Sequence, residues 1–386
     1  MISDVYHPRF NGVSTSIRTF RRELEKRGHN IWLIAPDYPP HRDLDEVVIR
    51  VPSHQLPFDP EDRLMSGKFI RRLEAALGAS KFDLIHIQTP FVAHYAATAL
   101  ARRLGLPVVE TYHTFFEEYL YHYIPFLPKS LLRMAARRLS SFQCNRLDAM
   151  VVPSHAMLAV LRQYGIVTQA EIIPTGIDLE RFDTGDGAAF RKHYGIPAER
   201  PLLLFVGRVA FEKNIGFLLE AMVKIKAELP QTLLVIAGEG PALAGLQRRA
   251  AALELNDNIL FIGYLHKGEQ LCDCYCAADA FVFASRTETQ GLVLLEAMAL
   301  GVPVVALAAM GTCDILAPGK GALVAQDDPS DFAVQCLRLL HDTELRKRLS
   351  DEGREYIHQW TAGAMAERML DFYRDVVARY DNTLRN

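Results

Sequence analysis

The sequence lacks the long apolar run that a membrane-spanning helix requires. No segment of its 386 residues reaches about 18 consecutive apolar residues, and we expect no signal peptide of secretory type. Low-complexity tracts are also missing, which argues against a disordered chain. These absences predict a globular protein that is cytoplasmic or peripheral on the inner face of the cytoplasmic membrane.

Cysteine is too sparse for a disulfide framework, since the chain contains only six. Three of them form a C-x-C-x-C run, Cys272, Cys274 and Cys276, and His266 lies nearby, which invites a zinc interpretation. The usual pair spacing is C-x2-C, and on a helix Cys274 would point away from the other two. Small buried thiols are therefore the favoured interpretation, and no metal is predicted.

Strong charge of either sign is absent as well. The formal net charge is -3, which argues against general nucleic-acid binding. Residues 1–175 contain 21 Lys and Arg against 17 Asp and Glu, whereas the remainder contains 22 against 29. The mild basic bias of the first half is compatible with an anionic membrane surface.

Short apolar, β-branched runs alternate with amphipathic helical stretches along the chain, which predicts parallel sheets covered by helices on both faces. In the first half the runs are 30–36, 47–52, 84–90, 108–114, 149–154 and 171–176. After Gly176 the pattern restarts with 202–208, 233–240, 259–265, 280–285, 303–309 and 322–325. We therefore expect an α/β fold of two doubly wound, Rossmann-like domains.

The restart places the expected domain boundary at Gly176, with residues 1–176 in one domain and 177–360 in the other. Ligands of doubly wound sheets bind beyond the carboxyl ends of the strands. Two such sheets that face each other would share one interdomain cleft, and movement about the segment near Gly176 would open and close it.

Two carboxylates frame a predicted helix start in "TETQGLVLLEAMALGVPVVA" (287–306). Gly291 and Leu292 begin this helix, whose first N–H groups and dipole favour a phosphate. A phosphate would repel Glu288, just before the helix, and Glu296, about one and a half turns inside it. The two are better placed to accept hydrogen bonds from hydroxyls on either side of the phosphate, as in a nucleotide-sugar.

Cations that suit a diphosphate follow another strand, in "FVGRVAFEKNIGFLLEA". Arg208 comes directly after the strand and Lys213 five residues later. Two solvated surface charges would be the ordinary interpretation of this spacing. Because both follow a strand end in the same domain as the Glu pair, we expect them to stabilise a leaving nucleoside diphosphate.

Together these motifs resemble a known family. The E-x7-E spacing of Glu288 and Glu296, "GRVAFEK" (207–213), "IIPTGIDLERF" (172–182) and "HPRFNGVSTSI" (7–17) are similar to the retaining glycosyltransferases of GT-B fold, family 4. The similarity covers nearly the whole chain. Within the family, "YHTFFEEYLYHYIPF" (112–126) resembles diacylglycerol α-glucosyltransferases.

The resemblance implies roles for individual residues. Glu288 would bind sugar hydroxyls and Glu296 the ribose, while the backbone at Gly291 and Leu292 would help with the diphosphate. His113 would lie at the sugar, between donor and acceptor. The remaining implied contacts are Arg208, Lys213 and Gly12 for the diphosphate, and Gly240, Tyr264 and Leu265 for the nucleobase.

The resemblance also implies a front-face reaction without a covalent intermediate, and the sequence offers no nucleophile and base pair of the glycosidase kind. The N-terminal domain would bind the acceptor and the C-terminal domain the donor, with a last helix, about 361–386, packing back on the N-terminal domain. One departure is the loop "MGTCD" (310–314), where Gly311 stands alone in place of a glycine pair.

Two features keep a second interpretation. A histidine that ends a buried strand, such as His113, is often a structural group, and the aromatic residues after it are compatible with either core or an acceptor-facing loop. The basic amphipathic stretch 128–146 is either an ordinary surface helix or a membrane contact.

The sequence therefore predicts a hexosyltransferase with UDP-glucose as the favoured donor and no other cofactor. A diacylglycerol-like lipid is the favoured acceptor, with peripheral membrane contact through 128–146. One alternative is a hexosyl or mannosyl transferase of polysaccharide synthesis. Another is a non-catalytic membrane-binding protein of the same fold, which would have no reason to keep a complete donor site.

Overall fold

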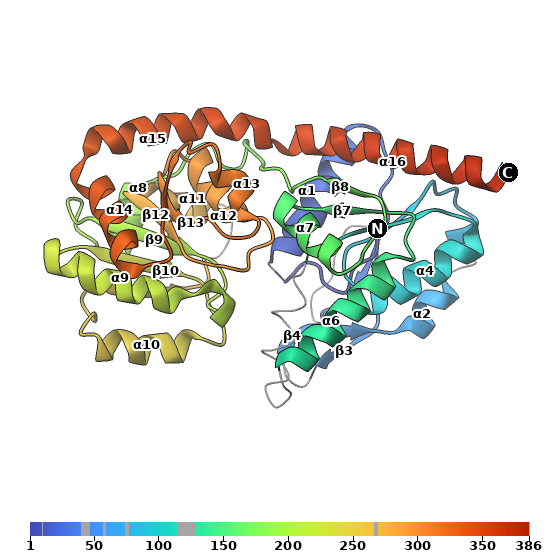
Figure 1. Ribbon diagram of the computed structural model, residues 1–386, viewed down its shortest axis with the longest axis horizontal. Helices are drawn as coiled ribbons and strands as arrows, with labels where there is room; N and C mark the ends of the chain where they lie inside the picture. The colour runs from blue at the N-terminus through green and yellow to red at the C-terminus, as the bar shows by residue number, and fades with distance from the viewer. Residues whose placement is uncertain are drawn as a thin grey trace. The chain divides into compact units, whose positions relative to one another are not determined.

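The computed structural model describes residues 1–9, 11–39, 47–56, 59–73, 77–113, 129–265 and 269–385. The chain divides into two compact units, Met1–Gly176 with Ala362–Asn386, and Ile177–Thr361. Both units combine parallel sheets with helices (Figure 1).

The N-terminal unit has a parallel sheet whose two halves are joined by the start of the chain. Ile2 forms parallel bridges to Ile34 and to Ile87, so the first residues act as a short central strand. In spatial order the strands are β2 (Val48–Val51), β1 (Leu33–Pro36), the Ile2 segment, β5 (Ile85–Ile87), β6 (Val108–Thr111), β7 (Ala149–Val152) and β8 (Ala170–Ile172). The chain moves outward from the centre in both directions, as in a doubly wound sheet.

An antiparallel hairpin beside this sheet was not predicted. It pairs β3 (Ser53–Leu56) with β4 (Asp59–Met65). The sequence of β4, DPEDRLM, has neither an apolar run nor an apolar and polar alternation, so it carries no periodic strand signal.

The helices of the N-terminal unit follow its strands in the expected order. They are α1 (Gly12–Lys26), α2 (Gly67–Arg72), α4 (Val92–Leu104), α6 (Lys129–Cys144), α7 (His155–Gln163) and, from the end of the chain, α16 (Ala362–Arg385). The apolar face of α16 packs into the core of this unit, since Ala366 and Met369 are fully buried there with Leu24 of α1.

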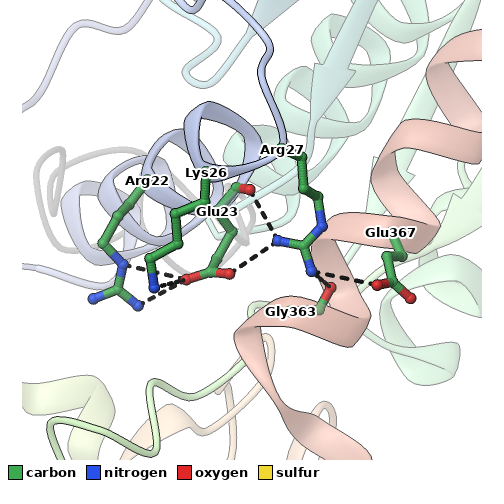
Figure 2. Close-up of polar contacts among 6 residues, drawn as sticks. All are labelled: Arg22, Glu23, Lys26, Arg27, Gly363 and Glu367. Atoms are coloured by element: carbon green, nitrogen blue, oxygen red, sulfur yellow. Dashed lines mark hydrogen bonds and ion pairs between the residues drawn. The ribbon is translucent and has the colours of Figure 1, made fainter.

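Polar contacts also hold α16 against α1 (Figure 2). The Arg27 guanidinium donates to the Gly363 carbonyl at 3.0 Å and lies 3.4 Å from Glu367. Glu23 lies at the centre of the group, and Arg22, Lys26 and Arg27 approach its carboxylate at 3.0–3.2 Å. Burial opposes the charge of Glu23, yet the hydrogen bonds from these three cations keep its pKa below the ordinary value.

The C-terminal unit has one six-stranded parallel sheet in the order β11-β10-β9-β12-β13-β14. The strands are β9 (Leu202–Val206), β10 (Leu233–Ala237), β11 (Ile259–Gly263), β12 (Ala280–Phe283), β13 (Val304–Leu307) and β14 (Ala322–Ala325). The chain runs outward from β9 to β11 and then returns to the centre to lay β12 beside β9. The pair β9 and β12 is therefore the switch point, where doubly wound sheets bind ligands.

Helices cover both faces of this sheet (Figure 1). They are α8 (Gly187–His193), α9 (Ile215–Glu228), α10 (Leu243–Ala252), α11 (Glu269–Cys276), α12 (Leu292–Ala299), α13 (Thr312–Leu316), α14 (Pro329–His341) and α15 (Thr343–Tyr356). In the figure the strands lie between α9 and α10 on one side and α11 and α12 on the other. Every residue of β10, β12 and β13 is buried, as expected for strands covered on both faces.

Candidate functional site

The loops that follow β9 and β12 meet at the switch point and are tied together by hydrogen bonds. The loop after β9 forms a short 3-10 turn, Phe211–Lys213, and Asn214 ends it with φ of 55°. The Asn214 amide donates to the Ala284 carbonyl at 3.1 Å, and the Ser285 hydroxyl donates to the Glu212 carbonyl at 3.0 Å. These bonds hold the cation-bearing loop against the loop that carries Glu288.

Lys213 and Glu288 form an ion pair at this junction. The Lys213 ammonium lies 2.5 Å from Oε2 of Glu288, and both side chains are 21% exposed. The same ammonium lies 6.0 Å from the centre of the Phe283 ring. The two charges form a charge-assisted hydrogen bond, yet remain accessible to a charged or polar ligand.

The Glu288 loop rests on Gly311, the residue that the sequence marks as a departure from the family pattern. The Gly311 N–H donates to the Glu288 carbonyl at 2.8 Å. A Cβ at Gly311 would lie 2.0 Å from the Thr289 carbonyl oxygen, so only glycine permits this close approach of two backbones. Gly311 therefore helps to fix the position of the loop that carries Glu288.

Helix α12 begins at the switch point without a capping side chain. Its N-cap is Gly291, with φ of 100°, which favours glycine. Leu292 is the first helical residue, and Leu294 donates back to the Gly291 carbonyl at 3.0 Å. A helix start of this kind suits an anionic ligand.

Glu296 lies one turn further along α12 and is held by a residue from another helix. The Tyr275 hydroxyl donates to Oε2 of Glu296 at 2.8 Å. Burial raises the pKa of Glu296, while the Tyr275 hydrogen bond and the charge of Arg181 act in the opposite direction.

The loop after β10 packs directly on the loop that carries Arg208. The Val209 N–H donates to the Glu239 carbonyl at 2.8 Å, and a Cβ at Gly240 would lie 2.4 Å from the Val209 carbonyl oxygen. Arg208 is half-buried. Next along this edge, Tyr264 is 42% exposed, whereas Leu265 packs against the core of the unit.

Two predicted site residues belong to the N-terminal unit. Gly12 is the exposed first residue of α1, and Asn11 caps that helix by accepting from the Ser14 N–H at 2.8 Å. His113 follows β6, and its Nε2 lies 3.0 Å from Oε1 of Gln88. Burial lowers the pKa of His113 to about 4, so the ring is neutral at physiological pH.

The structure thus brings five predicted residues, Arg208, Lys213, Glu288, Gly291 and Leu292, to the β9 and β12 loops of one unit. Three further residues were not predicted. The sequence held a signal for two of them, since Arg181 lies inside the quoted motif 172–182 and Asn214 directly follows Lys213, whereas Tyr275 lies inside the cysteine run and carries no signal of its own.

Other predictions concern segments outside the described residues. The aromatic stretch after His113, residues 114–128 with Glu117 and Glu118, is one, and His266 is another.

Cys272 and Cys274 are buried, and burial raises the pKa of Cys272 to about 11. Across the described ranges, no group of three or more His, Cys, Asp or Glu side chains is arranged to hold a metal ion. Nor does any helix there have the length and hydropathy to cross a bilayer.

Sequence and structure comparisons identify the family and the fold. Residues 10–181 match the model described as Glycosyltransferase Family 4, and residues 186–356 match the model described as Glycosyl transferases group 1. The chain is 35% identical over 315 residues to an alpha-monoglucosyldiacylglycerol synthase of Streptococcus pneumoniae, covering 79% of this chain and 70% of that one. It is 30% identical over 380 residues to a GDP-mannose-dependent alpha-mannosyltransferase of Mycobacterium tuberculosis, covering 95% and 90%.

Among solved structures, Anabaena HepE in complex with UDP and glucose superposes with a TM-score of 0.78 at 15% identity, over 97% of this chain and 99% of that one. The fold is therefore GT-B, as predicted from the sequence. The chain belongs to the group 1, family 4 glycosyltransferases.

Proposed function

We propose that this glycosyltransferase moves a hexose, with glucose favoured, from UDP-glucose to a lipid hydroxyl such as that of diacylglycerol, with retention of anomeric configuration. The observation that carries the donor half is the meeting of Lys213, Glu288 and the start of α12 at the switch point. The acceptor half is supported by the 35% identity to an alpha-monoglucosyldiacylglycerol synthase.

In this proposal the donor lies along the edge from β11 to β12. Tyr264 and Leu265 would contact the base beside Gly240, and Glu296 would accept a ribose hydroxyl. Arg208, Lys213 and the first N–H groups of α12 would bind the diphosphate, because all three supply positive charge or dipole. Glu288 would accept hydrogen bonds from hydroxyls of the sugar.

Binding of the donor would separate the Lys213–Glu288 ion pair, and each residue would bind a part of the donor instead. In the chain as it stands, the ammonium neutralises the carboxylate at 2.5 Å. A bound donor would give Lys213 the diphosphate and Glu288 the sugar hydroxyls, so neither half-buried charge is left without a partner.

The chemistry follows from where the charge goes. The bond between the anomeric carbon and the diphosphate oxygen breaks, and both bonding electrons leave with the diphosphate, where Arg208 and Lys213 stabilise them. The acceptor hydroxyl attacks the same face of the sugar and gives its proton to a departing phosphate oxygen. No carboxylate nucleophile is required, and neutral His113 would bind the sugar rather than act as a cation.

The acceptor side is proposed to be the N-terminal unit, with α6 in contact with the membrane surface. One face of α6 is buried, with Leu132 and Ala136 at 5% and 1% exposure. The opposite face leaves four large apolar side chains 42–49% exposed: Leu131, Met134, Leu139 and Phe142.

Arginines surround this apolar face. The Arg146 guanidinium lies 3.6 Å from the centre of the Phe142 ring, and that of Arg137 lies 5.3 Å from the Tyr164 ring. With Arg138 they line a shallow cavity of about 540 Å³, and none of the described residues in its lining is acidic. An exposed apolar face with guanidinium groups beside it fits the boundary between anionic headgroups and acyl chains.

The proposal is tested by incubating the purified chain with UDP-[14C]glucose and diacylglycerol in mixed micelles and separating the lipids by thin-layer chromatography. We expect one labelled glycolipid. An α-glucosidase, and not a β-glucosidase, should release the labelled glucose from it. The Glu288→Gln variant, which keeps the volume of the side chain but loses its charge, serves as the inactive control. No labelled lipid with any of UDP-glucose, UDP-galactose and GDP-mannose would refute the lipid assignment.

A second function has its own support. The 30% identity to a GDP-mannose-dependent alpha-mannosyltransferase extends over 95% of the chain, so transfer of mannose into a glycoconjugate is the main alternative. It predicts product from GDP-mannose and a soluble glycan acceptor without any need for micelles.

A further inference from the structure

Tyr275 is a buried polar residue that the proposed reaction has not yet used. It lies in α11, is fully buried, and packs its ring 5.5 Å from that of Phe281 in β12. A buried hydroxyl is costly unless it is hydrogen-bonded. Its hydroxyl donates to Oε2 of Glu296 at 2.8 Å, and the next acceptor, the Val293 carbonyl, lies at the limit of 3.5 Å.

This contact selects one orientation of Glu296. A glutamate side chain loses rotamer freedom when it is ordered, and an unsupported one would have to be ordered by the ligand. Here the Tyr275 hydroxyl engages Oε2, which leaves Oε1 as the oxygen available to a second donor. Among the described residues, Tyr275 is the one that donates a hydrogen bond to the Glu296 carboxylate.

Tyr275 is suited to orienting Glu296 because its hydroxyl does not ionise near neutral pH. Burial raises its pKa well above the ordinary value, and the charge of Glu296 raises it further. The hydroxyl therefore keeps its proton and always acts as the donor toward the carboxylate. Its ring packs between α11 and β12, so the hydroxyl that donates the hydrogen bond has a fixed position.

We infer that Tyr275 is a positioning residue that holds Glu296 ready for a ribose hydroxyl and so sets the preference of this chain for ribonucleotide donors over deoxyribonucleotide donors. The inference rests on the proposed function, in which Glu296 binds the ribose. Tyr275 itself does not touch the donor.

The consequence is a coupling between a protein hydroxyl and a ligand hydroxyl. A hydrogen bond from a ligand hydroxyl to an oriented carboxylate is worth about 10- to 100-fold in affinity. In Tyr275→Phe the carboxylate loses its partner and must be ordered by the ligand, so most of that advantage disappears. The ribose is distant from the bond that breaks, so KM for the donor should rise while kcat changes little.

The test is calorimetric titration of the full chain with UDP, 2′-deoxy-UDP and 3′-deoxy-UDP, and with the corresponding GDP set. The variants are titrated with the UDP set or the GDP set, according to which of UDP and GDP binds the wild type more tightly. The variants are Tyr275→Phe and, as a matched control, Tyr356→Phe, since Tyr356 is equally a buried tyrosine of this unit but packs against Trp360. Thermal unfolding midpoints of both variants verify that each is folded.

We expect the wild type and Tyr356→Phe to bind the parent nucleotide about tenfold or more tightly than one of its deoxy forms, and Tyr275→Phe to bind the two within about twofold. If Tyr275→Phe keeps the wild-type ratio, the inference is overturned and the ribose site stands. If the wild type shows no preference for either hydroxyl, or binds neither parent, the proposed role of Glu296 is what fails, and the inference fails with it.

Discussion

The Lys213 ammonium lies 2.5 Å from the Glu288 carboxylate, although the two residues are 75 positions apart in the sequence. The pair forms because β9 and β12 are neighbours in the sheet and the loops after them are tied together. Each member is proposed to bind a different part of the donor, so the pair is expected to matter for turnover more than for folding.

Replacement of Lys213 by Met should lower turnover about 100-fold or more, because the leaving diphosphate loses a preorganised cation. The free energy of unfolding should change by only about 1 kcal/mol or less, since a partly exposed ion pair contributes little. Steady-state kinetics and thermal unfolding measure the two effects. Lys347→Met, at an exposed lysine of α15, is the control and should behave as wild type. Turnover of Lys213→Met above half the wild-type rate would contradict the proposed role.

Replacement of Gly311 by Ala should impair activity strongly. The new Cβ would lie 2.0 Å from the Thr289 carbonyl oxygen, so the loop with Glu288 must shift, which we expect to cost about 1–3 kcal/mol of stability. Gly245→Ala is the matched control, because a Cβ there meets nothing within 4 Å in helix α10. That change should stabilise by up to about 1 kcal/mol. Equal activities of the two variants would show that the loop tolerates the shift.

The stability of the chain should depend on pH through His113. Burial lowers its folded pKa to about 4 from an ordinary 6.5, so between these values the unfolded chain binds more protons than the folded one. Wild type should therefore lose stability relative to His113→Gln as the pH falls from 6.5 to 4. Urea unfolding at several pH values measures this difference. A difference between wild type and His113→Gln that stays constant from pH 6.5 to 4 would refute the shift.

Binding to anionic vesicles should depend on the arginines of α6 and of the turn that follows it. Changing Arg138 and Arg146 together to Gln should weaken binding to phosphatidylglycerol vesicles about 30-fold, at about 1 kcal/mol for each charge. Sedimentation with the vesicles measures the affinity, and 0.5 M salt should weaken wild-type binding. Arg248→Gln, at an exposed position in α10 of the other unit, should leave it unchanged. Undiminished binding of the double variant would assign the membrane contact to another surface.

Much of the fold was predictable because most of its strands belong to parallel sheets. Parallel strands covered on both faces must be apolar nearly throughout, and β10, β12 and β13 are fully buried. The exceptions are local. Hairpin β3–β4 has a polar sequence without a periodic signal, and the short segment at Ile2 is completed as a strand only by its neighbours on both sides.

The candidate site was predictable in its residue types and not in its contacts. Glu288, Glu296, Arg208 and Lys213 were identified by their spacing, their places after strand ends and their resemblance to a family. Tyr275 was overlooked because it lies within a cysteine run, and a tyrosine among apolar residues is ordinarily core.

The sequence by itself therefore determined the class of fold, through apolar periodicity, and the types of residue that lie at the strand ends. The tertiary structure alone decided which of those residues meet. Lys213 pairs with Glu288, and Tyr275 with Glu296, because sheet order and helix packing bring distant segments together. Local periodicity says which face of a strand is buried, but the neighbour of a strand is chosen by the packing of the whole unit.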